Sequence, residues 1–547
     1  MSKALASSRV VIDDSIIPAT IVFSINSGKI LNIFKDRILS KEDPILQQYN
    51  VISYRNMDPY VILPGLVDSH VHLNEPGRTE WEGFATGTQS AASGGVTTVI
   101  DMPLNAVPPT TTVANFNKKI ECARGQTWVD MAFWGGLVPN NLDDLIPLIQ
   151  AGVRGFKGFL MDSGVDEFPM ITPSDINKIL ETVKDQHTMI MFHAEMDSGN
   201  EPDQLGGHCD SLEVLPKRAL QEYGPSLYKT ITEKQAELLS KSPVLQAVEP
   251  VVGRISKMMK SPPLDPRSLS SDDVTPLDMA SLTHDNLKSI DPREYDSFLA
   301  SRPDSFEVTA IKNIIKCQQK NPSVPVHIVH LATQQALPII ERAKYDLKLP
   351  LTVETCFHYL TLNSEEIPDG ATQFKCCPPI RSDSNRKALW NALLGGVITS
   401  VVSDHSPCTP NLKGLDKGDF FQAWGGITSV GLGMIALWTE GSQNFGISLT
   451  DIAKWCCENT AKQVGLSDRK GRIAAGLDAD FAIFDPDVVY QFENNKTYFK
   501  NKLTAFNGRK VKGRVIETIL RSYSIYALGK GVSEMPMGQL ILEPRTD

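Results

Sequence analysis

The sequence has no excess of basic residues, which argues against a general binder of nucleic acid or of anionic membranes. Its 547 residues include 54 Lys and Arg against 64 Asp and Glu, a net charge of −10. It also has no run of the ~18 apolar residues that a membrane-spanning helix needs. The opening stretch MSKALASSRVVIDD contains no apolar segment of a secretory signal, and a short transit peptide is the alternative kept open. We therefore expect a soluble, cytoplasmic protein without nucleic-acid or membrane partners.

Cysteine pairs of the Cys-x-x-Cys type are absent as well. The nine cysteines are scattered along the chain, so we expect reduced thiols rather than a disulfide framework. A hydrophobic content of 41% with 22% charged residues is typical of a globular protein that buries a sizeable core. A chain of this length is expected to hold one large catalytic domain and a smaller one.

Strand-like segments occur at both ends of the sequence. Near the start, apolar runs alternate with turns, as in VVIDDSIIPATIVFSI and PYVILP. A similar pattern returns near the end in GRIAAGLDADFAIFDPD and VKGRVIETILRS. We expect residues 1–64 and 471–547 to form one small β-sandwich domain that brings the two termini together.

Residues 65–470 alternate short apolar strands with helical stretches. The strands include TTVIDM, MAFWGGL, VRGFKGFL, TMIMFHAE, VHIVHLA, LTVETC and ITSVVSDHS. Repeated strand–helix units predict an α/β fold, a (β/α)₈ TIM-like barrel with active-site residues at the carboxyl ends of the strands. An open doubly wound sheet is the alternative, but no Gly-x-Gly-x-x-Gly follows the first strand to favour it.

One segment, residues 198–292, interrupts this alternation. It is rich in Ser, Pro, Asp and Leu, as in KSPPLDPRSLSSDDVTPLD, and stands where a single helix would be enough. We interpret it as an insertion in the barrel. It could cover the mouth of the active site, or it could be a surface excursion without a catalytic role.

Metal-competent side chains lie at or near the ends of several predicted strands. His70 and His72 share one strand face, because side chains two apart point the same way. Further candidates follow four other strands: Lys157, His193, His330 and Asp404. Each has an ordinary alternative, such as a hydrogen-bonded structural histidine, a lysine extending to the surface or an aspartate capping a helix. At one end of a barrel, however, these groups would converge, and imidazole and carboxylate suit Zn²⁺.

The sequence resembles the cyclic amidohydrolases with a binuclear metal centre, and within that group the allantoinases. The resemblance covers nearly the whole chain except residues 198–292 and the extreme termini. It is carried, in order, by PGLVDSHVHLNEPGRTEWEGF, GGVTTVIDMPLNAVPPTT, GFKGFLMDSGVDEF, FHAE, SRPDSFEV, VHIVHLAT, ETCFHYL, KCCPPIR, SDHSPC and GRIAAGLDADFAIFD. The ordered set is far more specific than His-x-His alone.

The resemblance implies a role for each ligand candidate. His70 and His72 would bind the first of two divalent cations, expected to be Zn²⁺. His193 and His330 would bind the second. Lys157 would react with CO₂ to form an anionic carbamate that bridges both cations, which accounts for a lysine in a buried strand.

Asp404, by the same resemblance, would bind the first cation and shuttle protons. Two cations about 3.5–4 Å apart would hold a hydroxide at neutral pH for attack on a ring carbonyl. Asp404 would take its proton and pass it to the leaving ring nitrogen. His327 is expected to be structural, and His405 to lie behind the ligands.

The resemblance also bears on the substrate, which would be allantoin, opened to allantoate in purine catabolism. Dihydroorotases, which this sequence also resembles, carry a His-x-His-x-Arg pattern whose arginine binds the carboxylate of the substrate. Asn74 stands there in this sequence and suits the neutral ureido arm of allantoin instead. The expected substrate contacts are Asn74, Asn105, Ser163, Cys377 and Gly426. Alternatives are another cyclic amidohydrolase, such as a hydantoinase, dihydropyrimidinase or dihydroorotase, and a non-catalytic scaffold homologue. A homotetramer is expected from the same resemblance.

Overall fold

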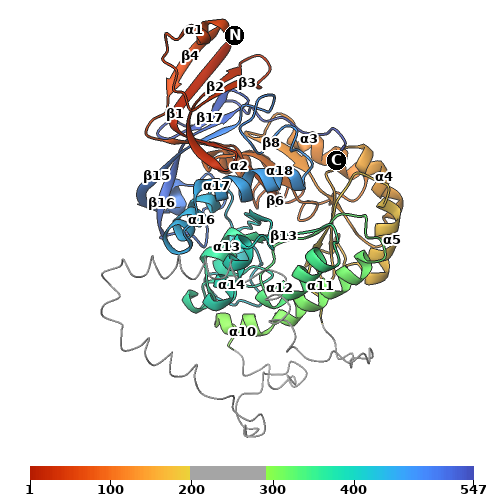
Figure 1. Cartoon of the computed structure of the whole chain (residues 1–547). Coiled ribbons are helices and arrows are strands. Elements are labelled where there is room, and N and C mark those ends of the chain that lie inside the picture. Colours follow the sequence, from red (N-terminus) through yellow and green to blue (C-terminus); the bar gives the residue numbers. More distant parts are fainter. Residues whose placement is uncertain (198–290, 547) are drawn as a thin grey trace, which may run out of the picture. The chain divides into compact units, whose positions relative to one another are not determined.

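The computed structural model describes residues 1–197 and 291–546 (Figure 1). The predicted insertion at 198–292 therefore lies almost entirely outside the described residues. Those that are described belong to one compact unit. The predicted domain boundaries at residues 64 and 470 accordingly stay predictions.

Parallel strands form a closed barrel. Its strands are β6 (Leu66–Val71), β7 (Val96–Asp101), β8 (Asp130–Phe133) continued by β9 (Gly135–Gly136), β10 (Phe156–Phe159), β11 (Ile190–His193), β12 (Val326–Ile328), β13 (Leu351–Cys356) and β14 (Ser400–Val402). Pairing runs from β6 to β8 and from β9 to β14. A parallel bridge between Val71 and His405 joins the first strand to the chain just after the last. The ring is thus closed, which confirms the predicted barrel and excludes the open doubly wound sheet.

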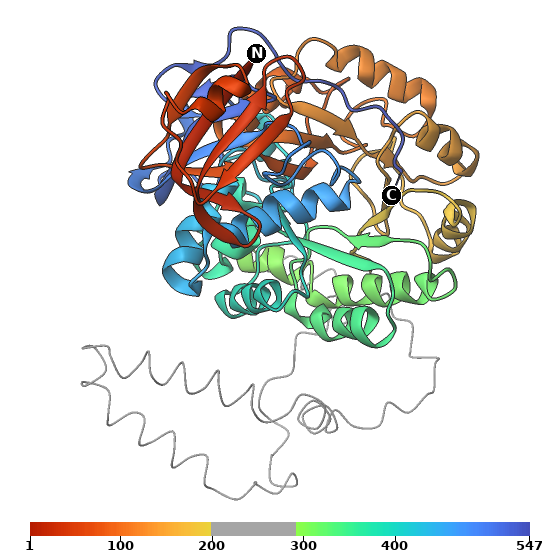
Figure 2. The same cartoon turned by 45° about the horizontal axis from the view of Figure 1, so that its top comes forward.

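Helices cover the outside of this barrel (Figure 2). The principal ones are α2 (Phe84–Ser93), α3 (Val113–Ala123), α4 (Leu142–Gln150), α5 (Pro173–Val183), α11 (Asp304–Gln318), α12 (Leu337–Glu341), α14 (Asp383–Leu394) and α18 (Asn459–Gln463). Helix α5 shows how the sequence specifies them. A capping box of Thr172 and Asp175 starts it, and apolar residues at helical spacing are buried: Ile176, Ile179, Leu180 and Val183. No helix in the described part of the chain is long and apolar enough to span a membrane.

A second, largely antiparallel sheet draws strands from both ends of the chain. It contains β1 (Ser2–Ile12), β2 (Ser15–Ser24), β3 (Ile30–Lys35), β4 (Val51–Asn56), β5 (Val61–Pro64), β15 (Phe481–Gln491), β16 (Lys510–Leu520), β17 (Tyr523–Ala527) and β18 (Gly531–Val532). Strands β5 and β15 pair with Phe481 opposite Pro64. The red and blue strands of Figure 1 accordingly lie side by side, as predicted for a β-rich part built from both termini.

The remaining α-helices of the described chain lie in connections and in the segment after β14. They are α1 (Pro44–Gln48), α10 (Tyr295–Ala300), α13 (Phe357–Thr361), α15 (Pro410–Lys413), α16 (Gly433–Glu440) and α17 (Leu449–Ala453). Helix α16 packs against β16 of the antiparallel sheet. This contact adds to the strand pairing between β5 and β15 in holding the ends of the chain together.

A buried ion cluster joins the antiparallel sheet to the barrel. The Lys470 Nζ atom lies 2.7 Å from Asp130 Oδ2, 2.8 Å from Asp478 Oδ2 and 2.7 Å from Asp480 Oδ2. Asp130 begins β8 of the barrel, and Asp480 immediately precedes β15. The three aspartates form a group of the kind that can hold a metal ion, but basic side chains already compensate their charge. Besides Lys470 these are Arg521 beside Asp130 and both Lys29 and Arg469 beside Asp478.

Candidate metal centre

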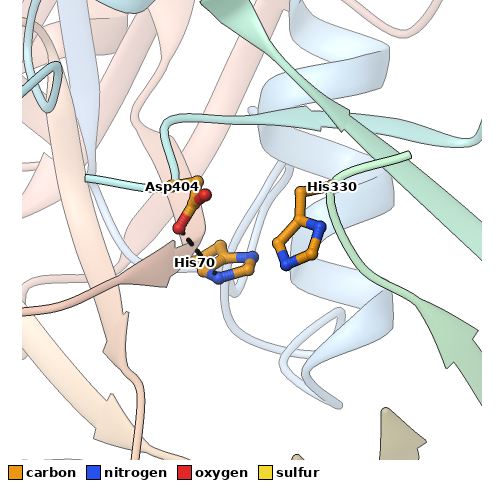
Figure 3. Close-up of side chains that lie close together, drawn as sticks. All are labelled: His70, His330 and Asp404. Carbon is orange, nitrogen blue, oxygen red and sulfur yellow. Dashed lines mark ion pairs between the residues drawn. The ribbon is translucent and has the colours of Figure 1, made fainter. Parts of the chain in front are cut away.

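The predicted ligands meet at the carboxyl end of the barrel. Five distances define the group: His70 Nε2 to Lys157 Nζ, 3.0 Å; His70 Nε2 to Asp404 Oδ1, 3.1 Å; His72 Nε2 to Asp404 Oδ1, 3.5 Å; His193 Nδ1 to His330 Nε2, 3.0 Å; and His70 to His330 ring centroids, 5.5 Å. In Figure 3, His70, His330 and Asp404 point toward one another, and a dashed line marks the His70–Asp404 ion pair. The structure thus brings all six predicted ligands together.

Strained backbone lies at the strand ends that carry these residues. Four candidate site residues have left-handed φ angles: Asn74 at 65°, Asn105 at 51°, His330 at 39° and Asp404 at 42°. Such a conformation costs a non-glycine residue about 1–3 kcal/mol and is found preferentially at functional sites. The strain is therefore consistent with strand ends shaped for a site.

Neighbouring oxygens fix which nitrogen of three histidines carries the proton. His70 Nδ1 lies 2.5 Å from Glu354 Oε1, His72 Nδ1 3.2 Å from the carbonyl oxygen of Leu104, and His193 Nε2 2.7 Å from Glu195 Oε2. A carbonyl oxygen or an ionised carboxylate can only accept, so each of these nitrogens donates. The other ring nitrogens, Nε2 of His70 and His72 and Nδ1 of His193, then direct their lone pairs toward the centre of the cluster. Glu195 is ionised because, although burial opposes it, the hydrogen bond from His193 and the charge of Arg302 lower its pKa to about 2.

The inward-facing atoms need positive charge between them. Ligand atoms of His70, His330 and Asp404 lie within 4.8 Å of one another. Lone pairs at this separation repel unless a cation or a proton lies between them. Burial and Lys157 oppose protonation of His70, yet the carboxylates of Asp404 and Glu354 raise its pKa. The donor set of imidazole nitrogens and a carboxylate fits a divalent cation.

Lys157 differs from the other buried lysines. Among the described residues, four more lysines are buried, and the ammonium group of each contacts carboxylate or carbonyl oxygens: Lys119, Lys375, Lys413 and Lys470. Within the described chain, the only hydrogen-bond partner of Lys157 Nζ is the His70 ring nitrogen, and the centre of the Phe159 ring lies 5.3 Å away. Burial lowers the pKa of Lys157 to about 8. An ammonium in this position would be poorly stabilised. The amine is therefore suited to modification.

A cavity of about 450 Å³ opens over the cluster. Four of the predicted substrate contacts line it: Asn105, Ser163, Cys377 and Gly426. Gly426 is required as glycine, since a Cβ there would stand 2.2 Å from the Ser406 carbonyl oxygen. Asn74 is not among the lining residues. It is buried, and its amide donates to the Pro407 carbonyl oxygen at 3.3 Å.

Other predicted residues support the ligands from behind. The His327 Nε2 atom lies 3.0 Å from Glu354 Oε2, so this histidine contacts the carboxylate that holds His70. The His405 ring accepts hydrogen bonds from the backbone of Ser429 and Val430, and its carbonyl oxygen accepts one from His72. Neither histidine is among the residues that line the cavity.

Three residues that hold the candidate ligands in place are not among those predicted from the sequence: Glu195, Arg302 and Glu354. Each stands in a segment that carries the family resemblance, FHAE, SRPDSFEV or ETCFHYL. The signal was thus present, but nothing in those segments pairs a given acid with a given histidine.

Comparison with known proteins identifies the family of this chain. The profile of the Amidohydrolase family matches residues 61–224 and 318–532. The allantoinase of Saccharomyces cerevisiae is 48% identical over 545 residues, 99% of each chain. The allantoinases of Streptomyces avermitilis and Arabidopsis thaliana are 39% and 32% identical, over 88% and 97% of this chain and 87% and 89% of their own.

Solved structures support the fold. The L-hydantoinase (dihydropyrimidinase) of Arthrobacter aurescens superposes with a TM-score of 0.76 at 22% identity, over 99% of this chain and 100% of its own. The dihydropyrimidinase of Brevibacillus agri gives 0.74 at 22% identity, with both chains fully covered at 100%. The barrel with its second β-rich part is therefore an architecture that solved hydrolases share. With the family profile and the full-length relatives, these findings mean that the chain belongs to the amidohydrolase family and, within it, to the allantoinases.

Proposed function

We propose that this protein hydrolyses the ring amide of allantoin to allantoate, with two divalent cations held by the cluster at the barrel mouth. The observation that carries the proposal is the buried Lys157 amine, which has no oxygen partner among the described residues and lies 3.0 Å from His70 Nε2. Its neutral form can attack the carbon of CO₂, form an N–C bond and release one proton. The resulting carbamate is an anionic ligand with two oxygens.

The ligand roles follow from which side chains lie together. His70, His72 and Asp404 would hold the first cation, and His193 and His330 the second, with modified Lys157 contacting both. Zn²⁺ is the cation we propose, since imidazole and carboxylate ligands suit it. When bound, the cations lower the pKa of water and polarise the carbonyl of the substrate.

Asp404 is proposed to move the proton. Burial alone would raise its pKa, but the neighbouring His70 holds it well below its ordinary value, so the carboxylate can accept. It takes a proton from the water whose oxygen bonds to the ring carbonyl carbon. It then gives that proton to the ring nitrogen as the carbon–nitrogen bond breaks. The product leaves with a new carboxyl group, which releases its remaining proton to solvent and becomes a carboxylate.

The cavity walls are proposed to orient the ring. Asn105 and Ser163 offer polar side chains, whereas Cys377 and Gly426 would act mainly through backbone groups. The Gly426 N–H donates to the Lys375 carbonyl oxygen, and the Gly426 carbonyl oxygen accepts from Lys413 Nζ at 2.6 Å, so a contact with the ring would use the second lone pair of that carbonyl. Asn74 sits at the position that an arginine takes in dihydroorotases. We propose that it acts on the substrate indirectly, by holding the Pro407 backbone through its side-chain amide. We also propose a cytoplasmic location, in keeping with the unpaired cysteines in the described chain. A homotetramer is proposed from the family resemblance.

Parallel hydrolysis assays test the proposal. Allantoin, hydantoin, dihydrouracil and dihydroorotate are supplied to the zinc-loaded full-length protein, and ring opening is followed for each. Allantoin is expected to give the highest kcat/KM. Fastest turnover of dihydrouracil or dihydroorotate would show that the substrate assignment is wrong.

A further inference from the structure

The segment Arg302–Glu307 carries two charged side chains that the proposed chemistry does not use. Arg302 precedes α11, and Glu307 lies in the first turn of that helix. The exposed fraction of the Arg302 side chain is 18%, and that of Glu307 is 2%. Burying charged groups is costly unless they are paired, so both need an explanation.

Arg302 reaches one of the ligand histidines through a carboxylate. One of its guanidinium nitrogens donates to Glu195 Oε2 at 2.6 Å, and that same oxygen accepts from His193 Nε2 at 2.7 Å. Arginine is not deprotonated in proteins, so it keeps Glu195 ionised and acceptor-only. The His193 proton is thereby held on Nε2, and the Nδ1 lone pair faces His330.

Glu307 reaches the neighbouring ligand through the backbone. Its Oε1 atom accepts from the amide nitrogens of Ala332 at 2.9 Å and Thr333 at 3.3 Å. These amides lie two and three residues after His330, whose φ of 39° turns the chain at this point. Arg381 pairs with the other Glu307 oxygen at 2.9 Å and compensates its charge. Glu307 therefore holds the backbone that aims His330.

The other half of the cluster is held by different groups. His70 is fixed by Glu354 and His72 by the Leu104 carbonyl oxygen. Within the part of the chain that the structure describes, neither of these histidines forms a hydrogen bond or ion pair with Arg302 or Glu307. A change in the α11 segment should therefore act on one half of the cluster and spare the other.

We propose that Arg302 and Glu307 are positioning residues for the second cation, acting on His193 through Glu195 and on His330 through its backbone. The inference rests on the proposed two-cation function and deepens it. Partners that orient metal-binding side chains typically change metal affinity by about 10–100-fold when removed. The segment SRPDSFEV thus acts as a brace for one of two inequivalent cation sites.

Cation binding to the full-length protein tests this brace. Arg302→Met is titrated with buffered Zn²⁺, and both stoichiometry and affinity are measured against the wild type. We expect one site to weaken by about 10–100-fold and the other to keep its affinity. Arg302→Lys should recover part of the loss, because an ammonium can still pair with Glu195. A residue with only a general structural role would show no such site selectivity.

Arg386→Met is the matched control. Arg386 is also largely buried and paired with carboxylates, those of Asp383 and Glu440, but on α14 and away from the cluster. The Arg386→Met variant should bind both cations with the affinities of the wild type. If Arg302→Met does not fold, Glu195→Gln gives the same comparison with the guanidinium retained.

The outcomes separate the brace from the proposed function. Unchanged affinity at both sites in Arg302→Met and Glu195→Gln, with the wild type binding two cations and opening allantoin, would overturn the brace alone. Equal weakening at both sites would overturn it too. A wild-type protein that binds no cation would instead remove the proposed function on which the brace rests.

Discussion

His70 Nδ1 lies 2.5 Å from Oε1 of Glu354, although the two residues are 284 positions apart in the chain. The other Glu354 oxygen lies 3.0 Å from His327 Nε2. One carboxylate on β13 therefore lies against two histidines, and only one of them faces the cluster. Glu354 fixes the His70 proton on Nδ1 and leaves Nε2 free to bind a cation.

Glu354→Gln should weaken cation binding. The glutamine amide is neutral, so its oxygen is a weaker acceptor for His70 Nδ1–H than the carboxylate is, and its NH₂ group cannot accept at all. We expect a loss of about 10–100-fold in Zn²⁺ affinity at the His70 site, measured by competition with a chelator. Glu458→Gln, an exposed carboxylate far from the cluster, serves as the control and should bind as the wild type does. Wild-type affinity in Glu354→Gln would contradict the assignment.

Lys157→Ala should abolish turnover and deplete bound cations, since it removes the proposed bridging ligand. A short carboxylic acid such as acetate or propionate can stand in for the carbamate, so added acid should restore part of the activity. Cation content by elemental analysis and allantoin turnover, each with and without the acid, check this. Near-normal activity without any acid would mean that the carbamate is not needed.

Asp404→Asn should lower kcat far more than it changes KM. Its proton transfer is used only in the transition state, and general acid–base groups typically contribute about 10²–10⁴-fold. Steady-state kinetics on allantoin give both constants, with cation content measured in parallel to separate ligand loss from proton-transfer loss. A loss of only several-fold in a variant that keeps its cations would argue against the shuttle role.

Lys470→Met tests a structural role at the joint of barrel and sheet. It removes the one ammonium that contacts Asp130, Asp478 and Asp480 together, and it leaves Asp480 without its basic partner, whereas Asp130 keeps Arg521 and Asp478 keeps Lys29 and Arg469. Breaking such a buried group costs about 3–5 kcal/mol. Chemical denaturation should show this loss of unfolding free energy. Lys496→Met removes an exposed pair with Glu493 and should cost less than about 1 kcal/mol. Equal losses of unfolding free energy in the two variants would contradict a structural role of Lys470 between the barrel and the antiparallel sheet.

Much of the fold could be predicted because the barrel strands are short apolar runs between helical stretches. Phe156–Phe159 and Ile190–His193 are fully buried, as such runs suggest. Closure of the ring could not be derived in the same way, because it depends on the pairing of Val71 with His405 across most of the chain. The resemblance supplied what the pattern alone left open.

The candidate ligands could be predicted for the same reason, since strand ends converge at one side of a barrel. Their supporting partners could not. Glu195 is only two residues from His193, yet a sequence does not reveal that Arg302 neutralises it. The predicted substrate contact at Asn74 illustrates a second limit, because the sequence does not show where a side chain points. It stands next to the His-x-His pair, but its left-handed backbone turns the amide toward Pro407 rather than the cavity wall.

Anomalous scattering at the zinc edge, from crystals of zinc-loaded protein grown with bicarbonate, tests the central claim most directly. We expect two peaks among His70, His72, His193, His330 and Asp404, and density for a carboxylate on the Lys157 amine. A map with an unmodified Lys157 and no peak at the cluster would contradict the account.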